Sequence, residues 1–235
     1  MMLKTFIKQV IRKATWGVNK KTIFQILSLR CRQEDKAENG RFTLKEIKQI
    51  ILQAELNAKE LIPYFTDYDN LGNYLMEYGG LLDLAIYRAL IKENVARNYA
   101  MKLVGDMIWQ ARLNGNGGIP IIYPLRRMWA RLTTKDPVDF LGRYIREAMK
   151  FPYSEPGYKV KFYKEKDGYR TDFYSCPVYD FYKQFGGEEV SLFRKTWCTL
   201  DYAVAENLVE GGKYQRRHTL SDGDEVCDMR WYIER

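Results

Sequence analysis

Two Asp-Gly dipeptides, Asp167-Gly168 and Asp222-Gly223, constrain the fold of this chain most strongly, because short segments of alternating apolar and polar residues flank each of them. Asp-Gly is a preferred sequence for the two-residue type I′ turn of a β-hairpin. Such a turn fixes the strand register, so that two residues face each other when their numbers have the same sum as the numbers of the two turn residues. The first dipeptide therefore predicts a hairpin in which Phe162 lies opposite Phe173, and the second predicts another hairpin near the end of the chain.

The remaining segments have the periodicity of helices. Between the two hairpins, apolar residues recur at the three-and-four spacing of a buried helical stripe. They are Val190, Phe193, Trp197, Leu200, Val204 and Leu208. Upstream, residues 43–46 have the Thr-x-x-Glu form of a capping box, which begins a helix. We also expect helical structure at 71–113, broken at Gly79-Gly80 and ended by the glycine cluster 114–118, and a further helix at 138–149.

These elements predict an α+β fold, in which a helical N-terminal part precedes a four-stranded antiparallel sheet made of two hairpins and covered by helices. The 235 residues divide by pattern into a basic amphipathic segment at 1–33, a helical part at 34–151 and an α+β part at 152–235. We expect these parts to form one compact domain, since a chain of this length can bury a single large core.

The net charge of +8 arises from the first 33 residues. They contain eight basic residues and no acidic one: Lys4, Lys8, Arg12, Lys13, Lys20, Lys21, Arg30 and Arg32. The other 30 basic residues match the 30 acidic ones, so the body of the chain is electrically balanced. This distribution argues against a nucleic-acid partner.

Residues 1–16 have apolar side chains at helical spacing, including Leu3, Phe6 and Val10. This pattern fits a helix on an anionic membrane surface, and it also fits a first helix that packs on the body. The sequence has no run of about 18 apolar residues and no secretory signal pattern. We therefore expect a cytoplasmic protein, with peripheral membrane contact through residues 1–16 as an alternative.

The four cysteines, Cys31, Cys176, Cys198 and Cys227, are widely spaced and include no Cys-x-x-Cys pair. This usage fits reduced thiols in a cytoplasm better than a disulfide framework, and it disfavours a compact zinc site. We expect no metal and no tightly bound organic cofactor, although a ligand set assembled by the fold stays open. We interpret Cys31 as structural.

The only histidine, His218, lies in the second predicted hairpin together with Cys227. A type I′ turn at Asp222-Gly223 would place them directly opposite each other on one sheet face, with Cβ atoms roughly 5 Å apart. An imidazole beside a thiol can take its proton and leave a thiolate nucleophile. The structural alternative is that both are packed groups, since cysteine is commonly buried.

A second candidate group lies in the helical region between the hairpins. Cys198 and Asp201 are three residues apart, and Arg194 and Tyr202 lie four residues before and after Cys198. Residues at these spacings are neighbours on a helix surface. An adjacent acid disfavours a thiolate at Cys198, whereas an imidazolium favours one at Cys227, so local chemistry prefers Cys227 as the nucleophile.

Three motifs occur in order within residues 172–232. They are Cys176-Pro177, then Trp197-Cys198-Thr199-Leu200-Asp201-Tyr202, then Arg217-His218-Thr219-Leu220 with Gly223-Asp224 and Cys227-Asp228-Met229-Arg230. Together they resemble the L-2-amino-thiazoline-4-carboxylic acid hydrolase family and, more distantly, small-molecule-binding domains of the vinyl-reductase type. The first resemblance implies hydrolytic opening of a cyclic thiazoline to an N-carbamoyl cysteine, and it implies that Cys198 belongs to the site.

Attack on the C=N carbon of such a ring needs a nucleophile, a proton donor and an anionic group. The candidate catalytic residues are Cys198, Cys227, His218 and Asp201, and the candidate substrate-binding residues are Arg217, Tyr202, Arg194 and Cys176. Strand alternation places Arg217 on the face opposite His218, so a cross-strand ion pair with Asp228 explains Arg217 equally well.

The sequence thus predicts a hydrolase-like enzyme that uses cysteine chemistry on a small heterocyclic, amino-acid-derived substrate. Two other functions remain open. One is a non-catalytic small-molecule-binding domain of the same fold. The other is a membrane- or partner-associated protein that acts through its basic N-terminal helix.

Overall fold

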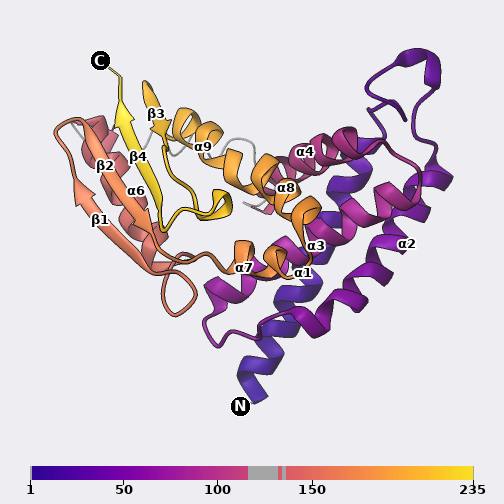
Figure 1. The fold of residues 1–235 in the computed structure, drawn as a ribbon, viewed down its shortest axis with the longest axis horizontal. Coiled ribbons are helices and arrows are strands. Elements are labelled where there is room, and N and C mark those ends of the chain that lie inside the picture. Colours follow the sequence, from indigo (N-terminus) through magenta and orange to yellow (C-terminus); the bar gives the residue numbers. More distant parts are fainter. Residues whose placement is uncertain (1, 116–131, 134–135, 235) are drawn as a thin grey trace.

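The computed structural model describes residues 2–115, 132–133 and 136–234 and has the α+β fold that the sequence predicts (Figure 1). On one side, α1 (Met2–Leu27), α2 (Leu44–Leu61), α3 (Leu71–Lys92) and α4 (Arg97–Gly115) form a helical bundle. On the other side, α6 (Pro137–Lys150) packs against a sheet. Between them run α7 (Pro177–Lys183), α8 (Gly187–Lys195) and α9 (Leu200–Leu208). Short 3₁₀ turns are η1 (Ala37–Asn39), η2 (Ile62–Tyr64), η3 (Trp197–Thr199) and η4 (Leu220–Asp222).

The start of α2 is as predicted, but the break expected inside α3 is wrong. The Thr43 hydroxyl accepts a hydrogen bond from Glu46 N, and the Glu46 carboxylate accepts one from Thr43 N, which completes the capping box. Helix α3 continues through Gly79 and Gly80 and ends at residue 92. A Cβ on Gly80 would lie 2.7 Å from Cγ1 of Val178, so this glycine lets α7 approach α3 closely instead of breaking the helix.

Two other helix predictions agree with the structure. Helix α4 ends at residue 115, inside the glycine cluster predicted to stop it; residues 116–118 of that cluster lie outside the described residues. Helix α6 covers the segment predicted at 138–149, and the Asp136 carboxylate caps it by accepting a hydrogen bond from Val138 N. The stripe at 190–208 is divided among α8, η3 and α9.

The sheet contains β1 (Val160–Lys164), β2 (Gly168–Phe173), β3 (Gly212–Gln215) and β4 (Cys227–Ile233), in the order β1-β2-β4-β3, with every neighbouring pair antiparallel. Side chains alternate between its faces. The inner face packs against α6 and α9 and includes Tyr169, Tyr214, Trp231 and Ile233. The outer face carries charged residues, including Arg170, Asp172, Asp228 and Arg230.

The register expected for the first hairpin is wrong by two residues. Phe162 pairs with Thr171 instead of Phe173. The amide of Glu165 donates to the carbonyl of Gly168 over 2.9 Å, so the two-residue loop is 166–167 and Gly168 belongs to β2. Gly168 is therefore a strand residue beside β4, where a Cβ would lie only 2.0 Å from the carbonyl oxygen of Trp231.

The register expected for the second hairpin is confirmed, whereas its tight turn is wrong. Gly212 pairs with Ile233 and Gln215 with Arg230, which is the predicted alignment. The ladder between β3 and β4 then ends, and residues 216–226 form a longer loop that contains η4. Gly223 follows η4 with a left-handed backbone, at φ 99°.

We predict that Gly168→Ala lowers the free energy of unfolding by about 3 kcal/mol, because the added methyl group meets a strand backbone that cannot move aside. The measurement is chemical denaturation followed by circular dichroism. Gly17→Ala serves as the control, since its Cβ would meet nothing within 4 Å and alanine suits a helix. Equal stability of the two variants would contradict the position of Gly168 inside the sheet.

Candidate active site

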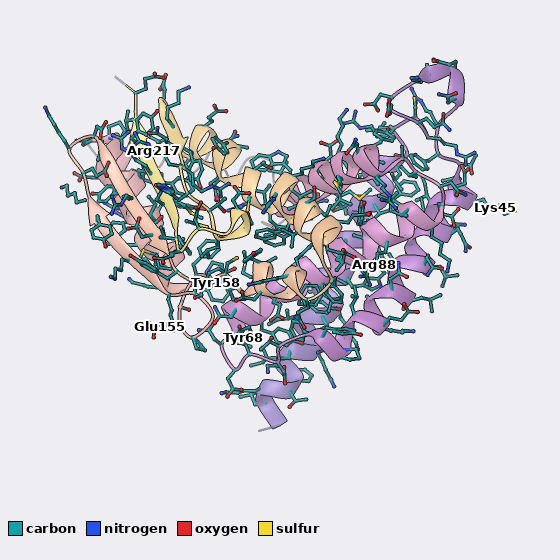
Figure 2. All side chains as sticks on the ribbon, in the orientation of Figure 1. Lys45, Tyr68, Arg88, Glu155, Tyr158 and Arg217 are labelled. Atoms are coloured by element: carbon teal, nitrogen blue, oxygen red, sulfur yellow. The ribbon has the colours of Figure 1, made fainter. Side chains whose placement is uncertain are left out.

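A cavity of about 110 Å³ lies between the inner face of the sheet and the surrounding helices. Helices on both sides of the molecule contribute to its walls, from α3 and α4 of the bundle to α6 beside the sheet. Tyr158 lies where the sheet side meets α7 (Figure 2). The lining residues with polar side chains or thiols include Arg112, Tyr144, Tyr153, Tyr158, Thr171, Cys176, Tyr179, Cys198, Asp201, Arg216, Thr219, Ser221 and Cys227. The remaining wall is largely apolar, as in many small-molecule sites.

Four of the eight residues selected from the sequence line this cavity, and four do not. Those that line it are Cys176, Cys198, Asp201 and Cys227. Those that lie outside it are His218, Arg217, Arg194 and Tyr202. The three cysteines reach it from the start of α7, from η3 and from the start of β4.

The expectation that His218 faces Cys227 is wrong. The Nδ1 atom of His218 lies 2.9 Å from Oδ2 of Asp228, and 57% of the histidine side chain is exposed. Asp228 Oδ1 accepts hydrogen bonds from the amides of Arg217 and His218, at 2.8 and 2.6 Å. These bonds turn the chain toward the outer face just where Cys227 points inward. The hydrogen bond to Asp228 raises the pKa of His218.

Of the other three residues outside the cavity, two have side-chain contacts that support the structure, namely Arg194 and Tyr202. Arg217 is exposed on the sheet side of the molecule (Figure 2). Arg194 donates from Nε and Nη2 to the carbonyl of Ser221 and pairs with Asp222 Oδ1 at 3.0 Å, so it holds η4 in place. The Tyr202 ring packs edge-on against Tyr214, with centroids 4.7 Å apart.

A chain of thiols and hydroxyls joins two of the cysteines along the cavity wall. Cys198 Sγ lies 3.7 Å from Ser221 Oγ, which lies 3.2 Å from Thr219 Oγ1. Thr219 Oγ1 in turn lies 3.4 Å from Cys227 Sγ. The amide of Leu220 also donates to Cys227 Sγ over 3.2 Å. The loop 216–226, which the sequence predicted as a tight turn, therefore supplies the direct partners of both sulfur atoms.

The environments of Cys198 and Cys176 favour the protonated forms of their thiols. Burial raises the pKa of Cys198, although the Arg216 guanidinium and the hydrogen bond with Ser221 act in the opposite direction. Burial also raises the pKa of Cys176 far above its ordinary value. Neither thiol is thereby activated as a nucleophile in this structure.

Charged groups occupy one part of the cavity wall. Burial raises the pKa of Asp201, while the positive charges of Arg112 and Arg216 oppose this shift. The Tyr214 hydroxyl lies 3.5 Å from Asp201 Oδ2, and Arg216 Nη2 donates to the carbonyl of Cys198 over 3.0 Å. A carboxyl group and two guanidinium groups can thus recognise a substrate that has both a basic nitrogen and an acidic group.

Sequence reasoning missed Arg216, although a signal for it was present. By strand alternation, Arg216 has the same parity as Tyr214, whose side chain packs on the inner face. The family motif instead includes Arg217, the next residue in the chain, whose side chain lies outside the cavity. Ser221, Thr219 and Arg112 had no comparable signal, because their positions depend on tertiary structure.

Trp197 is held in the cavity wall from the helical bundle. Its indole Nε1 donates to Asp83 Oδ2 over 3.1 Å, and Asp83 is buried in α3. Burial raises the pKa of Asp83 well above its ordinary value. Trp197 precedes Cys198 in η3, so this contact fixes the turn that carries a cavity thiol.

Among the residues that the structure describes, no group of three or more His, Cys, Asp or Glu side chains is arranged to hold a metal ion. The three cavity cysteines therefore do not form a ligand cluster with one another or with Asp201 in the described structure.

The fold and the site define an α+β protein with an internal cavity lined by cysteines. The profile of the L-2-amino-thiazoline-4-carboxylic acid hydrolase family matches residues 74–231, which is more than half of the chain, so the chain belongs to this family. The match extends the resemblance from residues 172–232 back into the helical bundle, and it suggests a hydrolase-like role. No curated protein and no solved structure matches the chain at a significant level.

We predict that His218→Gln leaves the alkylation rate of Cys227 by iodoacetamide within about twofold of the original, because the imidazole does not contact this sulfur. The rate is measured by mass spectrometry of the Cys227 peptide. Thr219→Val is the comparison variant and should change the rate, since it removes the hydroxyl beside Cys227 Sγ. A change of about tenfold or more in the alkylation rate of Cys227 on His218→Gln would contradict the separation between the imidazole ring and this thiol.

Proposed function

We propose that this protein is a hydrolase that opens a small, cyclic, amino-acid-derived substrate inside the cavity, with Cys227 as the nucleophile. The observation that carries the proposal is the convergence of three thiols, one buried carboxyl group and two arginines on one cavity. The family match makes 2-aminothiazoline-4-carboxylate the first substrate to test.

Cys227 is preferred over the other thiols because of its hydrogen bonds. The Leu220 amide donates to its sulfur, and the Thr219 hydroxyl lies beside it. Hydrogen-bond donors of this kind stabilise the negative charge that a sulfur atom has before it attacks as a thiolate. Burial, in contrast, raises the pKa of Cys198, so Cys198 has a supporting role through its contact with Ser221.

The proposed reaction consumes one water molecule and regenerates the thiol. The Cys227 sulfur adds to the ring carbon that lies between nitrogen and sulfur, and the bond from this carbon to the ring sulfur breaks. The leaving sulfur takes the proton that Cys227 gave up. Water then adds to the same carbon and expels the Cys227 sulfur, which regains a proton, so that the product has a ureido group and a free thiol.

Asp201 is the proposed proton-transfer residue in place of His218. A buried carboxyl group with a raised pKa can hold a proton closer to neutral pH than an ordinary aspartate, which suits general acid–base catalysis. Its position in the cavity wall supports this role. Arg216, with Arg112 near the same carboxyl group, is the proposed partner of the substrate carboxylate.

A non-catalytic small-molecule-binding domain is the second candidate function. The observation in its favour is the position of His218, the only histidine of the chain, outside the cavity. The same cavity would then bind a ligand through its arginines and aromatic rings without activating a thiol.

We predict that Cys227→Ser lowers kcat by at least about 100-fold, because the hydroxyl is a far weaker nucleophile. The measurement is mass spectrometry of the ureido product formed from 2-aminothiazoline-4-carboxylate. Cys31→Ser is the matched control and should retain full turnover, since Cys31 lies near the η1 loop and away from the cavity. Unchanged turnover in Cys227→Ser would refute the nucleophile, and ligand binding without any turnover would favour the binding domain.

We further predict that Arg216→Met raises KM roughly 10- to 100-fold, as expected when a charge-assisted hydrogen bond to a carboxylate is lost. The neighbouring variant Arg217→Met should change KM less than about twofold, because this side chain lies outside the cavity. An analogue without the carboxylate should bind equally to Arg216→Met and to the original protein. If Arg216→Met fails to fold, Arg216→Gln provides the same comparison, because it also removes the positive charge. Equal effects of the Arg216 and Arg217 substitutions on KM would contradict the assignment of Arg216 as the partner of the substrate carboxylate.

A further inference from the structure

Helix α1 has an apolar stripe that points away from the rest of the protein. Leu3, Phe6 and Val10 are 71%, 62% and 49% exposed. At 100° per residue they lie within an arc of about 60° on one helix face. A contiguous patch of three large exposed apolar side chains can mark an interaction surface.

The opposite side of α1 is attached to the body, which fixes the direction of the stripe. Lys8 pairs with Asp67 at 2.6 Å, and Lys4 approaches Asp69 at 3.7 Å. Both acids lie in the segment between α2 and α3. The stripe therefore remains on the outer side of α1, and the N-terminal end of this helix projects beyond the neighbouring helices (Figure 1).

The exposed face of α1 is positively charged. Lys13 and Lys21 are exposed and lie next to the apolar stripe on the helical wheel. Residues 1–33 include no Asp or Glu. This combination of large apolar side chains and flanking lysines is typical of helices that lie in the plane of a membrane surface. A second copy of the same face would bring like charges together, whereas anionic lipid headgroups attract them.

We propose that the exposed face of α1 binds the surface of a bilayer that contains anionic lipids. The helix lies parallel to the surface, with Leu3, Phe6 and Val10 inserted among the headgroups and Lys13 and Lys21 against lipid phosphates. Within residues 2–115, 132–133 and 136–234, no helix has the length and apolar character needed to cross a membrane. The binding surface lies outside the cavity wall and is independent of the proposed reaction.

The experiment is cosedimentation of the full chain with vesicles of phosphatidylcholine alone or mixed with phosphatidylglycerol. We expect binding to the mixed vesicles only, weakened by added salt. The double substitution Phe6→Gln and Val10→Gln should weaken this binding at least about tenfold. The double substitution Leu52→Gln and Leu56→Gln is the matched control, because these α2 side chains are also exposed, at 53% and 44%, but belong to another helix.

The substitutions Lys13→Glu and Lys21→Glu test the charge separately, and circular dichroism checks that each variant is folded. Loss of binding in this lysine variant, with the control variant unchanged, supports the proposal. Absence of vesicle binding, equal binding to neutral and anionic vesicles, or equal losses in the α1 and α2 variants would overturn it. Self-association that depends on Phe6 and Val10, without vesicle binding, would assign the face to a second copy of the chain and would also overturn the proposal.

Discussion

The hydrogen bonds of one carboxylate, Asp228, determine how the C-terminal motif is used. Asp228 follows Cys227 in β4, and strand alternation points the thiol inward and the carboxylate outward. The carboxylate accepts hydrogen bonds from the backbone amides of Arg217 and His218, and these bonds end the ladder between β3 and β4 and turn the chain. Partial burial would raise the pKa of Asp228, but its hydrogen bonds with His218 and Arg217 bring the pKa below its usual range. The loop 216–226 then places the hydroxyl groups of Thr219 and Ser221 between the sulfur atoms of Cys198 and Cys227.

The cavity depends on both halves of the molecule. Cys198 packs with the core of the helical bundle, whereas Cys227 packs with Tyr158 and Phe173 beside the sheet. Thr219 and Ser221 connect these two thiols across the boundary between the cores. The bundle also supplies Asp83, which holds Trp197 from behind. The family match, which begins within α3, includes this part of the bundle.

The chemistry of the cavity differs from that of a cysteine–histidine pair. The imidazole pairs with Asp228 on the outer side, whereas the charged groups near the Cys198 thiol are the guanidinium group of Arg216 and a buried aspartate, Asp201. A low-polarity enclosure strengthens charge interactions, so these few groups can have large effects on a bound molecule. Such an arrangement suits a substrate with a basic nitrogen and a carboxylate better than an apolar one.

Periodicity and short-range turn and capping preferences were enough to predict most of the helical segments, the four strands and the register of β3 with β4, but not the break between α3 and α4. The sequence by itself also selected Cys176, Cys198, Asp201 and Cys227, all of which line the cavity. It could not determine which way His218 would turn, since that depends on hydrogen bonds from the backbone to Asp228 that replace a strand pairing. The register of β1 with β2 was likewise decided by tertiary structure, because Gly168 is needed where β2 meets the backbone of Trp231 and is therefore not available for the turn. Local preferences act over a few residues, whereas the turn at His218 depends on a carboxylate ten residues away and the register of β2 depends on a strand roughly 60 residues away.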